Sequence, residues 1–132
     1  MTDYRNFPMV PRVIFGHNCF SQLGDILKKK RKSANAPFIF LVDDVFEGKE
    51  LANRVPVTGN DLSIFISAEY EPKTYQVDAL VEKIKTEYDE LPSGIIGIGG
   101  GTLLDLAKAV AIMLTNPGSP SDYLVWALLK HP

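Results

Sequence analysis

Three consecutive glycines, Gly99, Gly100 and Gly101, follow the apolar, β-branched stretch 95–98 and precede Thr102 and a helix-forming sequence. Glycine allows backbone conformations and close approaches that a Cβ atom would block. A helix that begins at such a turn points free N–H groups and the positive end of its dipole toward an anion. A threonine at this position can cap the helix and offer its hydroxyl to a phosphate oxygen. These residue types in this order predict a phosphate-binding turn.

The spacing of the glycines separates this turn from two common phosphate-binding motifs. It is not Gly-x-Gly-x-x-Gly, and no Gly-Lys-Ser/Thr follows as in a P-loop. Three glycines by themselves would equally fit a tight strand-to-helix turn that binds no ligand. The longer pattern Gly-Gly-Gly-Thr-x-x-Asp-x-Ala-Lys, from Gly99 to Lys108, is much more specific.

Two consecutive carboxylates, Asp43 and Asp44, end another apolar stretch, 38–42, whose composition is typical of a strand buried on both faces. A carboxylate there can accept hydrogen bonds from the ribose diol of a nucleotide, and it would repel a 2′-phosphate. Aspartate is also a preferred helix N-cap. We therefore expect one of the two to cap the helix that follows. The other, in the first place Asp44, is expected to bind the ribose.

A third carboxylate, Asp105, is expected in the first turn of the helix after the glycines. The helix dipole favours a negative charge there, and Lys108 is close enough along the helix to pair with it. The expected role of Asp105 is to support the turn, and Lys108 is expected to be solvated or paired.

Metal-binding and nucleophile motifs are not found in this sequence. His17, Cys19 and His131 are the only histidines and cysteine, and they do not have the spacing of a metal site. No Gly-x-Ser-x-Gly or equivalent pattern is present either. We therefore expect no metal site made wholly by this chain.

Length, charge and composition narrow the classes of protein further. The 132 residues suffice for a single domain, 1–132, with its own core. A net charge of −2 gives no electrostatic argument for nucleic acid or a membrane surface, and the cations of 28–32 are expected to be solvated at a helix end. Apolar stretches are too short to cross a bilayer, and the lone cysteine fits a reducing cytoplasm.

The apolar periodicity predicts strands that alternate with helices. This alternation requires crossover connections and therefore a mainly parallel sheet, with ligands at the carboxyl ends of its strands. The expected strands are 12–15, 38–42, 62–67 and 95–98. The expected helices are 19–30 with Asn18 as N-cap, 45–54, one after the loop 71–74 with Val77, Leu80, Val81, Ile84 and Tyr88 inward, 103–114, and a short last helix from Asp122 that contains Tyr123 and Trp126 as packing residues.

Several segments resemble, in order, the N-terminal half of the iron-containing (group III) alcohol dehydrogenases. They are the opening strand and turn 10–16, Leu-Val-Asp-Asp at 41–44, Glu-Pro-Lys-Thr at 71–74, the glycine pattern 99–108 with Thr102 where serine is usual, and 115–118. The resemblance covers nearly the whole chain.

This resemblance implies a Rossmann-like sheet with helices on both faces, as in the N-terminal domain of dehydroquinate synthase. It also implies NAD as cofactor, with Gly99 to Thr102 at the pyrophosphate and an aspartate of 43–44 selecting the cofactor; NADP stays open. Glu71 and Pro72 would lie near the adenine. In this family a second, helical domain binds Fe²⁺ or Zn²⁺, so the 132-residue chain is expected to lack that domain and to be inactive by itself.

Within the family, the elements Leu-Val-Asp-Asp, Glu-Pro-x-Thr and Asp-Tyr-x-x-Trp resemble the 3-deoxy-α-D-manno-octulosonate 8-oxidase branch most. The implied reaction is oxidation of a primary alcohol, in a small molecule or sugar acid, to an aldehyde, and the enzyme could be a homo-oligomer. Two alternatives stay open. One is a stand-alone nucleotide-binding module without catalysis, and the other is an enzyme of related fold that binds a sugar or nucleotide diphosphate.

Overall fold

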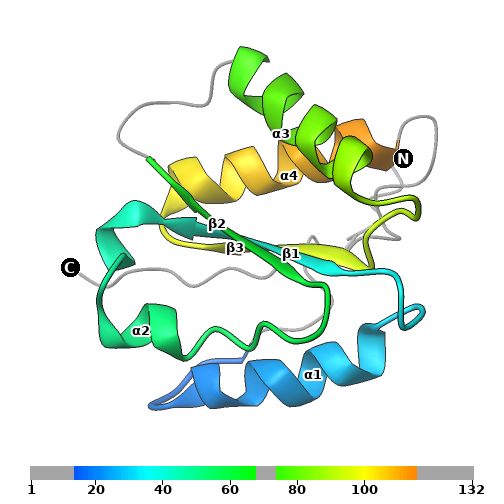
Figure 1. Cartoon of the computed structure of the whole chain (residues 1–132). Coiled ribbons are helices and arrows are strands. Elements are labelled where there is room, and N and C mark those ends of the chain that lie inside the picture. The colour runs from blue at the N-terminus through cyan, green and yellow to red at the C-terminus, as the bar shows by residue number, and fades with distance from the viewer. Residues whose placement is uncertain (1–13, 68–73, 116–132) are drawn as a thin grey trace, which may run out of the picture.

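The computed structural model describes residues 14–67 and 74–115. In this part, a three-stranded parallel sheet lies between two layers of helices, which confirms the expected α/β class (Figure 1). The strand order is β2-β1-β3, with β1 (Phe38–Asp43) in the centre and β2 (Leu62–Ile66) and β3 (Gly94–Ile98) beside it. One face carries α1 (Leu23–Lys30) and α2 (Glu50–Asn53), and the other carries α3 (Thr74–Glu87) and α4 (Gly101–Thr115).

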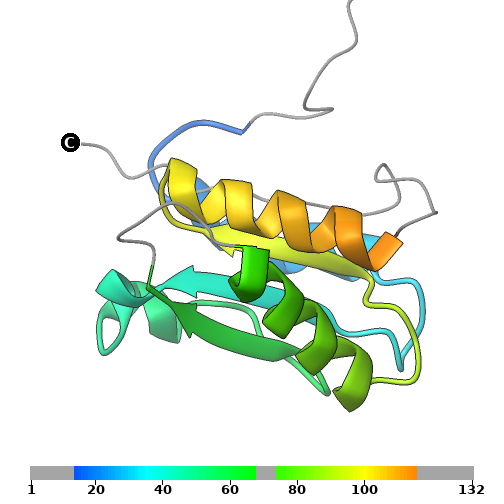
Figure 2. The same cartoon turned by 90° about the horizontal axis from the view of Figure 1, so that it is seen from above.

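The central strand β1 is buried on both faces, and its side chains alternate between two apolar clusters. Phe38 and Phe40 pack with the α1 side, whereas Ile39 and Leu41 pack with α3 and α4. Figure 2 shows α3 and α4 side by side on the latter face. Burial on both faces explains why β1 reads as a continuous apolar run in the sequence.

The register between β1 and β3 brings the acidic pair and the glycine turn together at the carboxyl edge of the sheet. Val42 of β1 pairs with Ile98 of β3, so Asp43, the last residue of β1, and Gly99, the first residue after β3, lie side by side. The acidic pair and the glycine turn are therefore neighbours at the carboxyl edge of the sheet.

The N-terminal part differs from the sequence expectation. Of the expected strand 12–15, residues 12 and 13 lie outside the described part, and Ile14 and Phe15 belong to no strand. The expected helix 19–30 is divided into a 3₁₀ turn, η1 (Cys19–Gln22), and α1. Asn18 does not cap it with its side chain, because its backbone is left-handed with φ 61°. Instead its carbonyl oxygen accepts hydrogen bonds from the Ser21 amide (3.1 Å) and hydroxyl (2.8 Å).

The segment expected to form one helix, 45–54, forms two short pieces. A 3₁₀ turn, η2 (Asp44–Phe46), is separated from α2 by Gly48, whose φ of +77° is incompatible with a continuous helix. In α3, the inward positions agree with the periodicity: Val77, Val81 and Ile84 are buried, and Leu80 and Tyr88 are half-buried. The expected helix from Asp122 lies outside the described residues.

An ion pair at the amino edge of the sheet was not anticipated from the sequence. Arg31 donates to both carboxylate oxygens of Asp61 at 2.8 Å and stacks over Phe38. Asp61 also accepts hydrogen bonds from the Phe38 amide at 2.8 Å and the Thr58 amide at 3.1 Å. Lys28, Lys29 and Lys30 are exposed as expected, but Arg31 is not a solvated cation, because it joins the end of α1 to β1 and β2.

Asp61 makes the stability of the fold depend on pH. Burial would raise the pKa of its carboxyl, but the hydrogen bonds from Arg31 and from the two amides outweigh burial and lower the pKa below its ordinary value. A lowered pKa in the folded state stabilises the fold at neutral pH, and this contribution is lost as the pH falls through the unfolded and then the folded pKa. The free energy of unfolding can be measured by urea at neutral pH and again near the folded pKa of Asp61. The decrease between the two pH values should be smaller in Asp61→Asn than in the wild type. An equal loss in both would contradict this assignment.

A buried serine, Ser93, also lies at the amino edge of the sheet. Ser93 donates its hydroxyl to the Ala36 carbonyl (2.7 Å) and accepts from the Lys32 amide (3.0 Å). Its own amide donates to the Pro37 carbonyl at 2.7 Å. Each of these polar groups is therefore paired, as buried groups must be.

Candidate functional site

The glycine turn connects β3 to α4 at the carboxyl edge of the sheet. The Leu104 amide donates to the Gly100 carbonyl at 3.1 Å, so Gly100 is the N-cap residue of α4. The amides of Gly101, Thr102 and Leu103 then form the first turn, where no carbonyl of the helix can accept from them. With the positive dipole end, they form a donor group suited to an anion.

Packing within the chain requires glycine at position 99. A Cβ atom there would lie 2.6 Å from Leu103 Cδ2 and 3.0 Å from Asp43 Cβ. Leu103 is fully buried and Asp43 ends the neighbouring strand, so neither can retreat without moving the turn. The role of Leu103 in covering Gly99 was missed by the sequence analysis. The one sequence signal for this role is a large apolar residue four positions after Gly99.

Gly100 and Gly101 have a different environment. A Cβ atom on either would meet no atom within 4 Å, and neither residue has a positive φ. Nothing in the described part of the chain therefore requires glycine at these two positions. A ligand that approaches the backbone closely would require it, so the turn fits the phosphate groups of a nucleotide.

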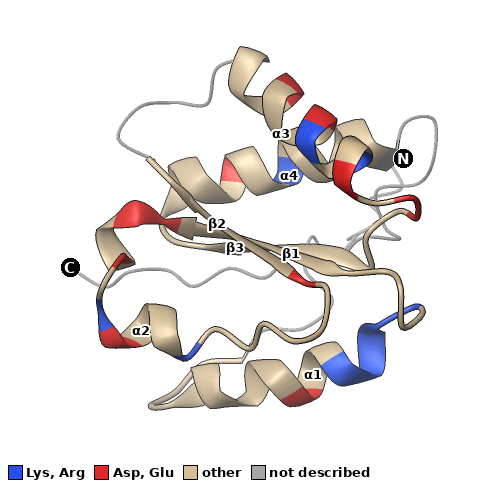
Figure 3. Ribbon diagram, in the orientation of Figure 1, with Lys and Arg blue, Asp and Glu red and all other residues tan. Residues whose placement is uncertain are grey.

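The acidic pair lies next to this turn. Asp43 accepts a hydrogen bond from the Val45 amide at 3.0 Å through Oδ1, so it caps η2 as expected for one of the two aspartates. Its second oxygen and the exposed carboxylate of Asp44 have no partner among residues 14–67 and 74–115. Figure 3 shows these acidic residues at the carboxyl end of β1, at the opposite edge from the lysines that end α1. Within the part of the chain that the structure describes, one oxygen of Asp43 and both oxygens of Asp44 are thus available to accept hydrogen bonds at this edge.

Two expectations about the turn are wrong, because α4 begins two residues earlier than expected. Thr102 is the second residue of α4 and not its cap. Asp105 is the fifth residue, beyond the first turn, and it is exposed. It forms no ion pair with Lys108 in the part of the chain that the structure describes. Of the three glycines only Gly101 is part of α4, so the helix begins at the last glycine and not after Thr102.

Other candidate residues lie away from this site or outside the structure. Glu71, Pro72 and His131 lie outside the described residues. His17 is exposed, and Cys19 is half-buried with its sulfur 3.9 Å from the Ile14 carbonyl oxygen. Among the described residues, no group of three or more histidine, cysteine or acidic side chains could hold a metal ion, and no helix is long and apolar enough to cross a membrane.

A comparison with protein families shows to which family the chain belongs. The sequence profile of iron-containing alcohol dehydrogenases matches residues 10–132, nearly the whole chain. The chain belongs to the iron-containing alcohol dehydrogenase family. The coarse expectation from the glycine pattern is therefore confirmed.

The chain is similar in sequence to several enzymes that are named for different substrates. The chain is 29% identical over 123 residues to NAD-dependent methanol dehydrogenase of Bacillus methanolicus, covering 89% of this chain and 30% of that protein. It is 32% identical over 117 residues to maleylacetate reductase of Pseudomonas knackmussii, covering 87% of this chain and 30% of that protein. The chain thus spans about a third of the length of these alcohol dehydrogenase relatives.

Solved structures of the family share the fold. Maleylacetate reductase from Agrobacterium tumefaciens superposes with a TM-score of 0.64 at 17% identity, over 96% of this chain and 33% of that one. Sulfoacetaldehyde reductase from Bifidobacterium kashiwanohense, solved in complex with NAD⁺, superposes with a TM-score of 0.61 at 20% identity, over 86% and 32%. At these identities the likeness shows that the fold is that of the iron-containing alcohol dehydrogenases.

Proposed function

We propose that this chain is the NAD-binding part of a metal-dependent alcohol dehydrogenase that oxidises a primary alcohol to an aldehyde. The observation that carries the proposal is the open glycine turn, whose first amides have no acceptor within α4, directly beside the carboxylates of Asp43 and Asp44. The NAD⁺ complex of a family member with the same fold supports NAD as the ligand class. When bound, NAD supplies the hydride acceptor, and the residues of this chain position it.

Each part of the site has a proposed role. The amides of Gly101 and Thr102 bind the pyrophosphate, and Gly99 and Gly100 let it approach. The acidic pair, Asp43 and Asp44, accepts hydrogen bonds from the adenosine ribose. Its negative charge disfavours the 2′-phosphate of NADP, because like charges at short distance repel.

We expect the metal to be bound by the second, helical domain that the family resemblance implies, and not by the residues described here. We expect Fe²⁺ or Zn²⁺ as a Lewis acid on the substrate oxygen, as the family implies. The substrate class proposed from the sequence is that of the octulosonate 8-oxidase branch. This proposal rests on the resemblance of Phe-Gly-x-x-x-Phe, Leu-Val-Asp-Asp, Glu-Pro-x-Thr, Met-Leu-Thr-Asn and Asp-Tyr-x-x-Trp. The methanol dehydrogenase and maleylacetate reductase named above give this branch no support.

A nucleotide-binding module without catalysis is the second candidate, because the glycine turn and the acidic pair could bind a nucleotide whether or not a reaction follows. The two candidates differ in catalysis. We expect no alcohol-dependent formation of NADH by the 132-residue chain with added Fe²⁺ or Zn²⁺. Turnover by this chain would show that its own residues complete the catalytic site.

A fluorescence titration with NADH and with NADPH tests the cofactor site. We expect saturable binding that favours NADH. Asp43→Asn removes the negative charge but keeps an oxygen that can accept from the Val45 amide. A change in nucleotide binding by this variant would therefore not result from a lost cap. At least one of Asp43→Asn and Asp44→Asn should reduce the preference for NADH over NADPH about ten-fold, because it removes a negative charge that would repel the 2′-phosphate.

The control variant is Asp89→Asn, which removes the same charge from an exposed position after α3. It should leave both affinities unchanged. A preference for NADH that neither Asp43→Asn nor Asp44→Asn alters would contradict the role of the acidic pair, and the absence of any binding would contradict the proposed site.

A further inference from the structure

The glycine turn has few side chains that could hold it in place. Gly99, Gly100 and Gly101 carry none, and the side chain of Thr102 is only half-buried. Leu103 is the first residue after the glycines whose side chain is fully buried. Its amide also belongs to the first turn of α4, whose N–H groups have no acceptor within the helix. Leu103 therefore joins the donor amides to the apolar core.

The Leu103 side chain packs back against the start of the turn. A Cβ atom at position 99 would lie 2.6 Å from Leu103 Cδ2 and 3.2 Å from Leu103 Cβ, so this side chain covers the Gly99 backbone directly. The same position lies 3.0 Å from Asp43 Cβ. Gly99 is thus held between Leu103 and Asp43. In a close-packed interior, the size of Leu103 then fixes how near the turn lies to the acidic pair.

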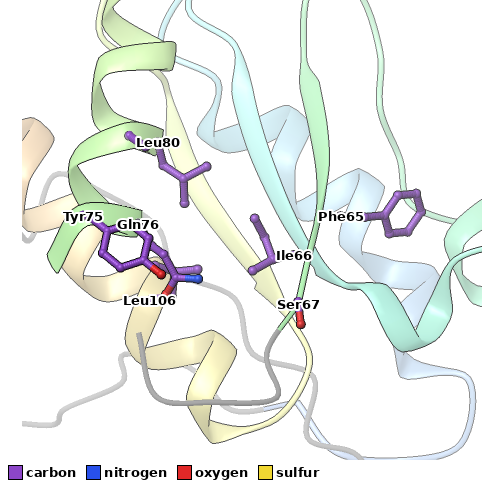
Figure 4. A pocket seen from close by; sticks show the side chains of 8 residues that line it. Phe65, Ile66, Ser67, Tyr75, Gln76, Leu80 and Leu106 are labelled. Atoms are coloured by element: carbon purple, nitrogen blue, oxygen red, sulfur yellow. The ribbon is translucent and has the colours of Figure 1, made fainter. Parts of the chain in front are cut away.

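Other leucines of α4 are equally buried but lie elsewhere. Leu106 lines an apolar groove of about 260 Å³ between β2 and α3, together with Ile66 and Leu80 (Figure 4). Leu114 belongs to the same apolar cluster as Leu103 and is 5% exposed. It follows Leu103 by eleven positions, which is about 16 Å along the helix. Leu114 is therefore a matched control for burial without contact to the turn.

We propose that Leu103 is a positioning residue for the nucleotide, because its side chain holds the glycine turn at a fixed distance from Asp43. This inference rests on the proposed function, since the distance matters only if one ligand binds the amides and the carboxylates together. The buried side chain does not touch the ligand and acts through Gly99 and the amides of the turn. Without this support the turn must be ordered when the nucleotide binds, which lowers the affinity.

Leu103→Val tests this role with a small change in volume. Valine lacks the Cδ2 atom that covers Gly99, but it keeps an apolar side chain in the core. The dissociation constant of NADH, measured by fluorescence titration, should rise about four-fold, the equivalent of one buried methylene group. Leu103→Met keeps a long apolar side chain that can cover Gly99, and it should bind NADH as the wild type does.

Leu114→Val is the control for a purely structural effect. It removes the same group from the same helix and cluster, so both valine variants should lower the melting temperature by about 5 °C. Only Leu103→Val should change the affinity for NADH. Equal affinities of Leu103→Val, Leu114→Val and the wild type would overturn the positioning role.

A measurement without ligand tests the packing itself. Gly99→Ala should lower the melting temperature less in the Leu103→Val background than in the wild type, because the contact with Cδ2 is then absent. An equal decrease in both backgrounds would show that Leu103 does not control the turn. A wild-type chain that binds neither NADH nor NADPH would contradict the proposed function and this inference with it, whereas failure of the inference alone would leave wild-type binding intact.

Discussion

Gly99→Ala is expected to weaken NADH binding by about ten-fold or more and to destabilise the fold by about 1–3 kcal/mol, the usual cost of overpacking a buried site. The added Cβ would lie 2.6 Å from Leu103 Cδ2 and 3.0 Å from Asp43 Cβ. The turn must move away from β1 to accommodate it, which separates the two halves of the proposed nucleotide site. NADH titration and urea unfolding of the same preparation measure both effects.

Gly101→Ala is the matched variant, because its Cβ would meet no atom of the chain. Alanine is the better residue in a helix, so stability should stay the same or rise by up to about 1 kcal/mol. NADH binding should nevertheless weaken, since the new methyl group lies where a phosphate would approach the backbone. If Gly101→Ala bound NADH as the wild type does, the close approach of a ligand to this turn would be disproved.

Asp61→Ala is expected to destabilise the fold by about 3 kcal/mol. Removal of this carboxylate leaves the half-buried Arg31 guanidinium without its counter-ion and leaves the Phe38 amide without its acceptor. Breaking a buried pair by removing one partner costs far more than breaking an exposed one. Urea unfolding followed by circular dichroism measures the difference.

Two controls separate this effect from a general loss of charge. Asp89→Ala, at an exposed position, should change stability by less than about 0.5 kcal/mol. NADH affinity of folded Asp61→Ala should equal that of the wild type, because Asp61 lies at the amino edge of the sheet and the glycine turn at the carboxyl edge. A stability change no larger than that of Asp89→Ala would show that the Arg31–Asp61 pair contributes little.

Local sequence patterns were sufficient for most elements of the fold. The strand β1 was predicted close to its observed bounds and the inward face of α3 was predicted correctly, because burial imposes a period on the sequence. Predictions failed at the ends of elements. Asn18 is a good capping residue by type, but the left-handed turn in which it lies prevents capping, and a cap depends on backbone conformation that residue type does not determine.

The sequence by itself determined that the glycine turn and the acidic pair share one edge. Strands that alternate with helices form a parallel sheet, and the segments after parallel strands emerge at the same edge. Family membership was likewise readable from the glycine pattern, because this pattern resembles the signature of the family whose profile matches the chain.

Tertiary structure decided which of these segments touch. Asp43 contacts Gly99 only because β1 and β3 are neighbours in a register that pairs Val42 with Ile98. Arg31 and Asp61 are thirty positions apart, and nothing in either local sequence indicates that they meet. Strand order and register depend on the packing of the whole core, and contacts between distant residues follow from them and not from local composition.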